Sequence, residues 1–165
     1  MNQRTYTSAL LLGVTAGLRT MTAPASLALA QQQPGAAKNW LLGSPRTARV
    51  LTILALGELI FDKLPFAPKR IAPAGLSGRV LSGAMCGAAV VDEHQATGAL
   101  LGVAGALASS FAGYAIRKAA VRASGVPDAL VALAEDGLAI GIGTVAASMG
   151  SEAKGELRTP WAHVA

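Results

Sequence analysis

An arginine in the middle of an apolar segment constrains this chain more than any other feature. Residues 8–30 (SALLLGVTAGLRTMTAPASLALA) are long and apolar enough to cross a bilayer, yet Arg19 lies near their midpoint. A charge at bilayer depth costs ~3 kcal/mol or more, so it normally faces the protein interior or a wet cavity. Pro24 then removes a backbone donor, which leaves helix carbonyls that need polar partners. We therefore predict a helix that is interrupted near its midpoint.

The composition indicates a helical integral membrane protein. Of the 165 residues, 52% are hydrophobic and 14% are charged, whereas soluble domains carry about 25% charged residues. The 19 glycines suit helices whose backbones approach closely in lipid. The net charge of +5 raises nucleic-acid binding as an alternative, but Lys and Arg lie between the apolar segments and form no stripe. They are better explained as topology determinants and contacts to membrane lipids, and we expect no nucleic-acid partner.

Five apolar segments are predicted to cross the membrane. They are residues 8–30, 46–63, 76–91, 96–121 and 127–149. Together they form one all-α transmembrane domain over residues 1–150, a polytopic helical bundle, and residues 151–165 are expected to be a polar C-terminal tail. If all five cross, eight Lys and Arg fall on one side and five on the other, which places the N-terminus in the cytoplasm.

A cleaved signal peptide is the alternative for the first segment. Arg4 would form the basic region, residues 9–18 the apolar region, and residues 28–30 (ALA) the cleavage site. Against this, Arg19 follows the apolar region about a dozen residues before the cleavage site.

Glycine spacing predicts close helix–helix contacts. Four G-x-x-x-G pairs lie inside the predicted segments: Gly13/Gly17, Gly83/Gly87, Gly98/Gly102 and Gly137/Gly141. Such pairs let two helix backbones approach, either within one chain or between the copies of a homo-oligomer.

A weak internal repeat points to a transporter-like plan. The string LLGV occurs at residues 11–14 and again at 100–103, and the alignment that follows pairs Thr20 with Ser109 and Pro24 with Gly113. The fourth segment is thus a candidate for a matching interruption. With three crossings between them, the first and fourth segments would be inverted, as in many small-solute transporters.

Polar residues at predicted membrane depth form the candidate site for a ligand or ion. They are Arg19, Thr20, Thr22, Glu58, Ser109, Ser110 and Asp136. The two carboxylates could relay a proton, bind a cation or pair with Arg19, and a half-helix restarting near Pro24 would offer N–H groups to an anion. The alternative is a structural bridge between the arginine and a carboxylate that only holds helices together.

The sequence offers no support for an enzyme, a cofactor or a metal. Cys86 is the only cysteine, and His94 and His163, the two histidines, lie outside the apolar segments. This leaves no zinc, haem or iron–sulfur ligand set, and the usual hydrolase, P-loop and dinucleotide-binding motifs do not occur.

Two strings resemble a known family. GLRTMTAPAS and GELIFDKLPFAPKRIAPAGLSGRVLSGAMCGAA are similar to the signature of an uncharacterised bacterial family of small Gly/Ala-rich integral membrane proteins, the domain-of-unknown-function 4126 family. The resemblance covers residues 8–149. It implies a protein of the bacterial inner membrane that retains its first segment, and it supplies no activity, substrate or catalytic residue.

From these patterns we expect a small transporter or channel for an ion or solute, acting as a homo-oligomer, with its site at the broken first helix. The alternative is a non-catalytic membrane subunit that binds lipid, pigment or a larger membrane complex.

Overall fold

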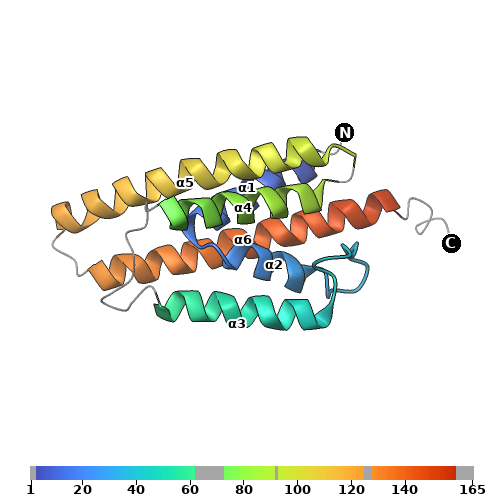
Figure 1. The fold of residues 1–165 in the computed structure, drawn as a ribbon, viewed down its shortest axis with the longest axis horizontal. Coiled ribbons are helices and arrows are strands. Elements are labelled where there is room, and N and C mark those ends of the chain that lie inside the picture. The colour runs from blue at the N-terminus through green and yellow to red at the C-terminus, as the bar shows by residue number, and fades with distance from the viewer. Residues whose placement is uncertain (1–2, 62–72, 92, 125–127, 159–165) are drawn as a thin grey trace.

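Six helices and no strands make up the part of the chain that the computed structural model describes, which is residues 3–61, 73–91, 93–124 and 128–158 (Figure 1). The helices are α1 (Gln3–Leu18), α2 (Thr22–Ala30), α3 (Pro45–Phe61), α4 (Pro73–Val90), α5 (Gln95–Ser124) and α6 (Asp128–Arg158). The all-α prediction is confirmed. The predicted interruption of the first segment is also present, because residues 19–21 separate α1 from α2.

The first helix runs antiparallel to the last. The Ser8 hydroxyl of α1 donates a 2.6 Å hydrogen bond to the Ala146 carbonyl, in the second half of α6. Eleven residues later, Arg19 pairs with Asp136, near the start of α6. As α1 advances, its contacts therefore move backwards along α6.

The second helix returns along the same partner in the opposite direction. Gly143 of α6 lies against both α1 and α2, because a methyl group added to it would come within 2.9 Å of Thr15 Cγ2 and 3.0 Å of Ser26 Oγ. Beyond α2, Gly35 approaches Gly155, so α2 runs parallel to α6. The structure thus replaces the single crossing expected for residues 8–30 with a helical hairpin. Hydropathy measures the length of an apolar segment but carries no information on its direction.

The hairpin changes the topology of the whole chain. The start of α1 and the end of α6 lie at the same end of the bundle, which we call the terminal end, and the opposite end is the far end (Figure 1). α3 and α5 run from the terminal end to the far end, and α4 and α6 return (Figure 1). Four helices therefore traverse the bundle, and the hairpin enters and leaves at the terminal end.

The inverted repeat is not observed. Gly13 of α1 packs on Gly102 of α5, and Gly17 packs on Ser109, so the two helices run in the same direction. The prediction assumed three crossings between the first and fourth segments, which would make them antiparallel. The turn between α1 and α2 adds one more change of direction, so α1 and α5 are parallel. The two copies of LLGV instead lie side by side in parallel helices.

The predicted interruption of the fourth segment is wrong. α5 is continuous from Gln95 to Ser124. The Ser109 hydroxyl donates to the Gly105 carbonyl of its own helix at 2.8 Å, and Gly113 is accommodated without a break. Nothing in this stretch removes a backbone donor, whereas Pro24 does so in α2.

Residues 151–158, which were expected to belong to a polar C-terminal tail, form the last turns of α6. α6 continues through Arg158, and residues 151, 153, 154 and 155 are buried. The Lys154 ammonium group donates a 2.9 Å hydrogen bond to the Ala89 carbonyl, one residue before the end of α4. A cation at a helix C-terminus is stabilised by the orphan carbonyls and the helix dipole, so the last turns of α6 secure the end of α4.

Three of the four glycine pairs lie in contacts within the chain. Gly13/Gly17 of α1 and Gly83/Gly87 of α4 both face α5, where Gly98/Gly102 receive the second pair. A methyl group added to Gly102 would overlap the carbonyl of Gly83, which shows that the backbones themselves are in contact. Around Gly137/Gly141 of α6, in contrast, no described atom lies within 4 Å of an added methyl group.

Many large apolar side chains are exposed, and the interior contains polar side chains beside its mostly small apolar residues. Large exposed hydrophobic residues include Ile53 and Ile60 on α3, Leu81 on α4, Leu100 and Ile116 on α5, and Leu133 and Val145 on α6. The buried set includes Ser8, Thr15, Arg19, Arg79, Ser109, Ser110, Asp136 and Lys154. Among the described helices, two are long and apolar enough to cross a membrane, over Gln95–Ala120 and Leu130–Glu156. This is weak evidence for a membrane protein, and it does not extend to all five predicted segments.

Replacing Gly102 tests the backbone contact between α4 and α5. Gly102→Leu should destabilise the bundle by about 3 kcal/mol because the side chain has no space in which to repack. Cys86 is fully buried, so its reaction with a thiol dye during heating in detergent reports unfolding. Gly141→Leu is the matched control, since it adds the same side chain at an open position. Equal unfolding temperatures for the two variants would contradict this packing.

Candidate functional site

The turn of the hairpin, residues 19–21, is the most polar buried point of the bundle, and we call it the tip. Met21 precedes α2, and the Ala25 amide donates to the Met21 carbonyl at 3.1 Å to close the first helical turn. Pro24 is the third residue of α2, where an amide has no partner within the helix. The proline is therefore tolerated at the start of the new helix and prevents α1 from continuing through it.

Glu58 of α3 caps the start of α2. One carboxylate oxygen accepts the Thr20 amide at 2.8 Å, and the other accepts the Met21 amide at 2.7 Å. A carboxylate at a helix N-terminus is favoured by both hydrogen bonding and the helix dipole. The sequence had indicated that the N-terminus of the helix near Pro24 could bind an external anion. In the structure, the Glu58 carboxylate occupies this position.

Arg19 pairs with Asp136 of α6. Its Nε donates to Asp136 Oδ1 at 2.7 Å, and its Nη2 contacts the same oxygen. Arg19 is 1% exposed and Asp136 is 6% exposed, so both charges are removed from the surface. Such a pair is strongly destabilised when one partner is lost, because the remaining charge stays buried. Of the two carboxylates considered as partners for Arg19, Asp136 makes the ion pair and Glu58 binds the neighbouring backbone.

Two serines bind the carbonyls that the chain reversal leaves unpaired. The Ser82 hydroxyl of α4 donates to the Thr20 carbonyl at 2.6 Å, and the Ser110 hydroxyl of α5 donates to the Gly17 carbonyl at 3.1 Å. Ser110 was among the predicted site residues and Ser82 was not. Ser82 lies in an apolar helix beside a glycine pair, and no feature of the sequence distinguishes it from serines that only pack.

Each of the four traversing helices therefore contributes one side chain to the tip or to the last turn of α1 that leads into it. We call these four residues the tip clamp: Glu58, Ser82, Ser110 and Asp136. Ser109, also predicted, bonds within α5 and packs against Gly17. Of the predicted residues, Arg19, Glu58, Ser110 and Asp136 thus meet at or beside the turn, in the contacts that a structural bridge requires, and their binding of a ligand or ion stays a prediction.

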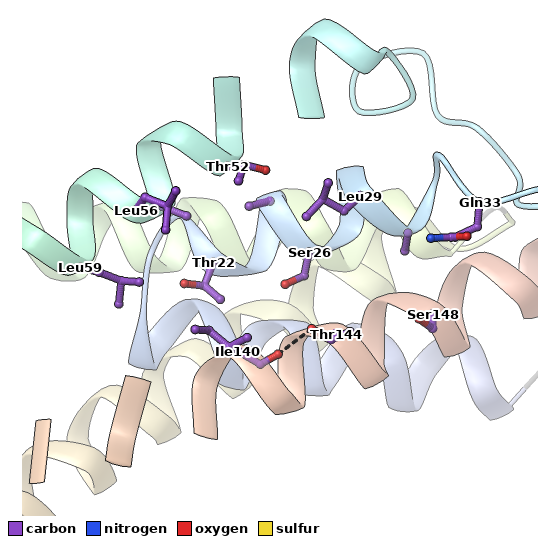
Figure 2. Close-up of a pocket in the computed structure, with 13 residues that line it drawn as sticks. Thr22, Ser26, Leu29, Gln33, Thr52, Leu56, Leu59, Ile140, Thr144 and Ser148 are labelled. Carbon is purple, nitrogen blue, oxygen red and sulfur yellow. Dashed lines mark hydrogen bonds between the residues drawn. The ribbon is translucent and has the colours of Figure 1, made fainter. Parts of the chain in front are cut away.

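Thr20 and Thr22 have different surroundings. Thr20 is half-buried, and its methyl group lies near Gly78 of α4. Thr22 lines a groove of about 260 Å³ between α2, α3 and α6 (Figure 2). Thr22 is therefore the predicted residue that links the tip to an open volume.

Hydroxyl groups follow the length of this groove. Figure 2 shows Thr22 and Ser26 on α2, Thr52 on α3, and Thr144 and Ser148 on α6, with Gln33 at the terminal end. Thr52 and Thr144 each donate a 2.8 Å hydrogen bond to a carbonyl of their own helix, to Ala48 and Ile140 respectively. Their remaining lone pairs can accept, so these two hydroxyls can bind a cation or a hydrogen-bond donor.

A second cavity continues the groove at the terminal end. It has a volume of about 430 Å³ and shares Ala30, Gln33 and Ser148 with the groove. Glu152 and Glu156 also line it, and no described residue that lines either cavity is basic. Together the two open cavities extend from the terminal end towards the tip, with two carboxylates at the terminal end and five hydroxyls among the apolar residues of the groove.

Comparison with known proteins adds no assignment: no protein-family model, curated protein or solved structure matches this chain.

Loss of Asp136 tests the buried ion pair. Asp136→Asn should lower the free energy of unfolding by about 3 kcal/mol, because Arg19 keeps its charge in a buried position. The double variant Arg19→Met/Asp136→Leu should recover most of this loss. Thermal unfolding followed through Cys86 measures both, with the exposed Glu152→Gln as control. A single variant as stable as the parent would contradict the pairing.

Loss of the Glu58 charge tests the helix cap. Glu58→Gln can accept through only one oxygen, so it should lose about 2 kcal/mol and loosen the tip. A cysteine placed at Thr20 should then react faster with a water-soluble maleimide, while the buried Cys86 stays silent. Glu93→Gln, at an exposed position, is the control. Unchanged reactivity at residue 20 would show that Glu58 does not hold the turn.

Proposed function

We propose that this chain is a multi-pass membrane protein of the bacterial inner membrane that conducts or transports a small cation or polar solute. The membrane location is supported by the outward-facing apolar residues, by the two helices of sufficient length and by the resemblance to the domain-of-unknown-function 4126 family. A hairpin with a buried charge at its turn also suits a membrane interior, where irregular backbone is tolerated when other protein segments surround it.

In this proposal, α3 to α6 cross the bilayer and the hairpin enters from one side only. With this topology, the numbers of Lys and Arg on the two sides of the membrane become nearly equal. In the sequence, Lys63, Lys69 and Arg70 connect α3 to α4, and Arg79, Arg117, Lys118 and Arg122 lie in the far-end parts of α4 and α5. The terminal end carries Arg4, Lys38, Arg46, Arg49, Lys154 and Arg158. Seven against six no longer favours a cytoplasmic N-terminus.

The single observation that carries the functional proposal is the pair of adjoining open cavities that extends from the terminal end towards the tip. The outer cavity has two carboxylates. The inner one has five hydroxyls among its apolar lining residues and reaches Thr22, which follows Met21, whose amide Glu58 binds. The Ser151 hydroxyl beside the outer cavity is buried and has no hydrogen-bond partner among the described residues. Oxygen ligands with no basic residue among the described lining residues favour a cation or a donor-rich solute over an anion.

We propose no catalytic role, because the ionisable groups of the tip hold the hairpin in place. Arg19 and Asp136 neutralise each other, and Glu58 is bound to two amides. In a transport cycle, α3 is the natural moving element. Only Ala48 and Ala55 of its residues are buried, and it forms one wall of the groove.

Filling the groove tests the transport proposal. Ser26→Leu and Thr144→Leu should each reduce flux at least about tenfold, measured with a panel of monovalent cations and small neutral solutes in proteoliposomes, because the side chains occupy the route. Val145→Leu is the control, since it changes the exposed neighbour of Thr144 outside the groove. The proposal fails if the parent protein moves none of the panel or if the filled variants match the parent.

A second candidate, a structural membrane subunit, is favoured by the open glycine pair of α6. A methyl group added to Gly137 or Gly141 would meet no described atom of another helix within 4 Å, so this face of α6 has room for a helix of another protein or of a second copy. In that case Gly141→Leu would abolish co-purification with a membrane partner, and the groove variants would leave assembly intact.

A further inference from the structure

A buried serine hydroxyl at the terminal end lacks a hydrogen-bond partner among the described residues. Ser151 of α6 is 3% exposed, and its hydroxyl makes no hydrogen bond to any described atom. A buried polar group in this state costs free energy, so its presence in a folded protein calls for an explanation. Ser151 lines the outer cavity, which lies between the last turns of α6 and the segment that follows α2. A ligand in that cavity could bind the hydroxyl.

Two carboxylates line the same cavity in an arrangement that is unfavourable without a cation. Glu152 and Glu156 are exposed and four residues apart on α6, so they share one face of the helix and repel each other. Glu156 also lies in the last turn of α6, where the helix dipole disfavours a negative charge. Lys154 lies between them in the sequence, but its ammonium group binds the Ala89 carbonyl of α4 and does not line the cavity.

The other walls of the cavity add further negative potential. Ala30, at the end of α2, lines it, so the negative end of the α2 dipole lies beside the two carboxylates. The Gly35 carbonyl oxygen lies at the wall, within 2.6 Å of a methyl group added to Gly155. None of the described lining residues is basic, and none offers sulfur or imidazole. The cavity therefore presents carboxylate, hydroxyl and carbonyl oxygens to a ligand.

We infer that the outer cavity binds a hard divalent cation, and calcium matches its ligands best. Glu152 and Glu156 balance two positive charges, and the Ser151 hydroxyl supplies a neutral oxygen. Calcium accepts six to eight oxygen ligands in flexible geometry and completes its shell with water, whereas softer metals select sulfur and imidazole. The role of the site as the entrance to the groove rests on the proposed function, but the binding itself does not require transport.

Calcium binding is tested by isothermal titration calorimetry of the full chain in a non-ionic detergent with about 150 mM KCl, which screens diffuse attraction between charges. The parent should bind one calcium ion per chain with a dissociation constant of about 10⁻⁴–10⁻³ M, as open sites with few carboxylates do. Glu152→Gln/Glu156→Gln should weaken binding at least about tenfold because both charged ligands are lost. Glu93→Gln, which removes an exposed carboxylate outside the cavity, should bind as the parent does.

A serine variant separates a ligand from a packing residue. Ser151→Ala breaks no hydrogen bond to a described residue, so its unfolding temperature in a calcium chelator should be no lower than that of the parent. Its affinity for calcium should nevertheless fall about threefold, because one neutral oxygen ligand is lost. The reaction of the buried Cys86 with a thiol dye during heating measures the unfolding temperature.

The inference is overturned if the parent shows no saturable calcium binding below about 10 mM, tenfold above the weakest class of calcium module. It is also overturned if the double glutamine variant or Ser151→Ala binds calcium as tightly as the parent. Flux in proteoliposomes separates this failure from that of the proposed function. A chain that binds calcium as described but moves no solute refutes transport alone, whereas a chain that transports without binding calcium refutes the site alone.

Discussion

The structure depends on satisfying the backbone and the charge at a turn buried inside a helical bundle. Ending a helix exposes amides and carbonyls that cost free energy wherever water is absent. Here Glu58 binds two amides, Ser82 and Ser110 each bind a carbonyl, and Asp136 neutralises Arg19. Because the four partners come from four helices, the position of the tip sets the depth of every traversing helix relative to the others.

The glycine contacts make this arrangement possible. A serine hydroxyl has a short reach, so Ser82 and Ser110 can contact the tip only if α4 and α5 lie against α1. The contacts of Gly13 and Gly83 with Gly102 bring these three backbones together a few turns away. The small residues and the polar residues therefore act together. The glycines let the helix backbones approach closely, and the short serine side chains can then bind the carbonyls that the interrupted helix leaves unpaired.

The sequence predicted that the first apolar segment is interrupted near Arg19 and which residues lie around the interruption. It did not predict that the chain reverses its direction there. Arg19 and Pro24 located the turn because a charge and a missing donor are costly in the middle of an apolar helix. Asp136 followed as a buried counter-charge. The reversal was missed because an apolar segment looks the same whether it crosses or folds back, and the decisive contacts of Gly143 with both hairpin helices are long-range. The unbroken α5 was missed because Ser109 can either interrupt a helix or bond within it, and sequence does not decide between them.

The order of the clamp residues along the chain has a consequence for biosynthesis. All four follow the hairpin in sequence, and the last of them, Asp136, lies 117 residues after Arg19. When the hairpin leaves the ribosome, no partner for its turn has yet been made. The Glu58 contacts with the Thr20 and Met21 amides can form as soon as α3 has been synthesised, whereas the ion pair of Arg19 requires α6. The charge of Arg19 is therefore the last part of the tip to find its partner during synthesis.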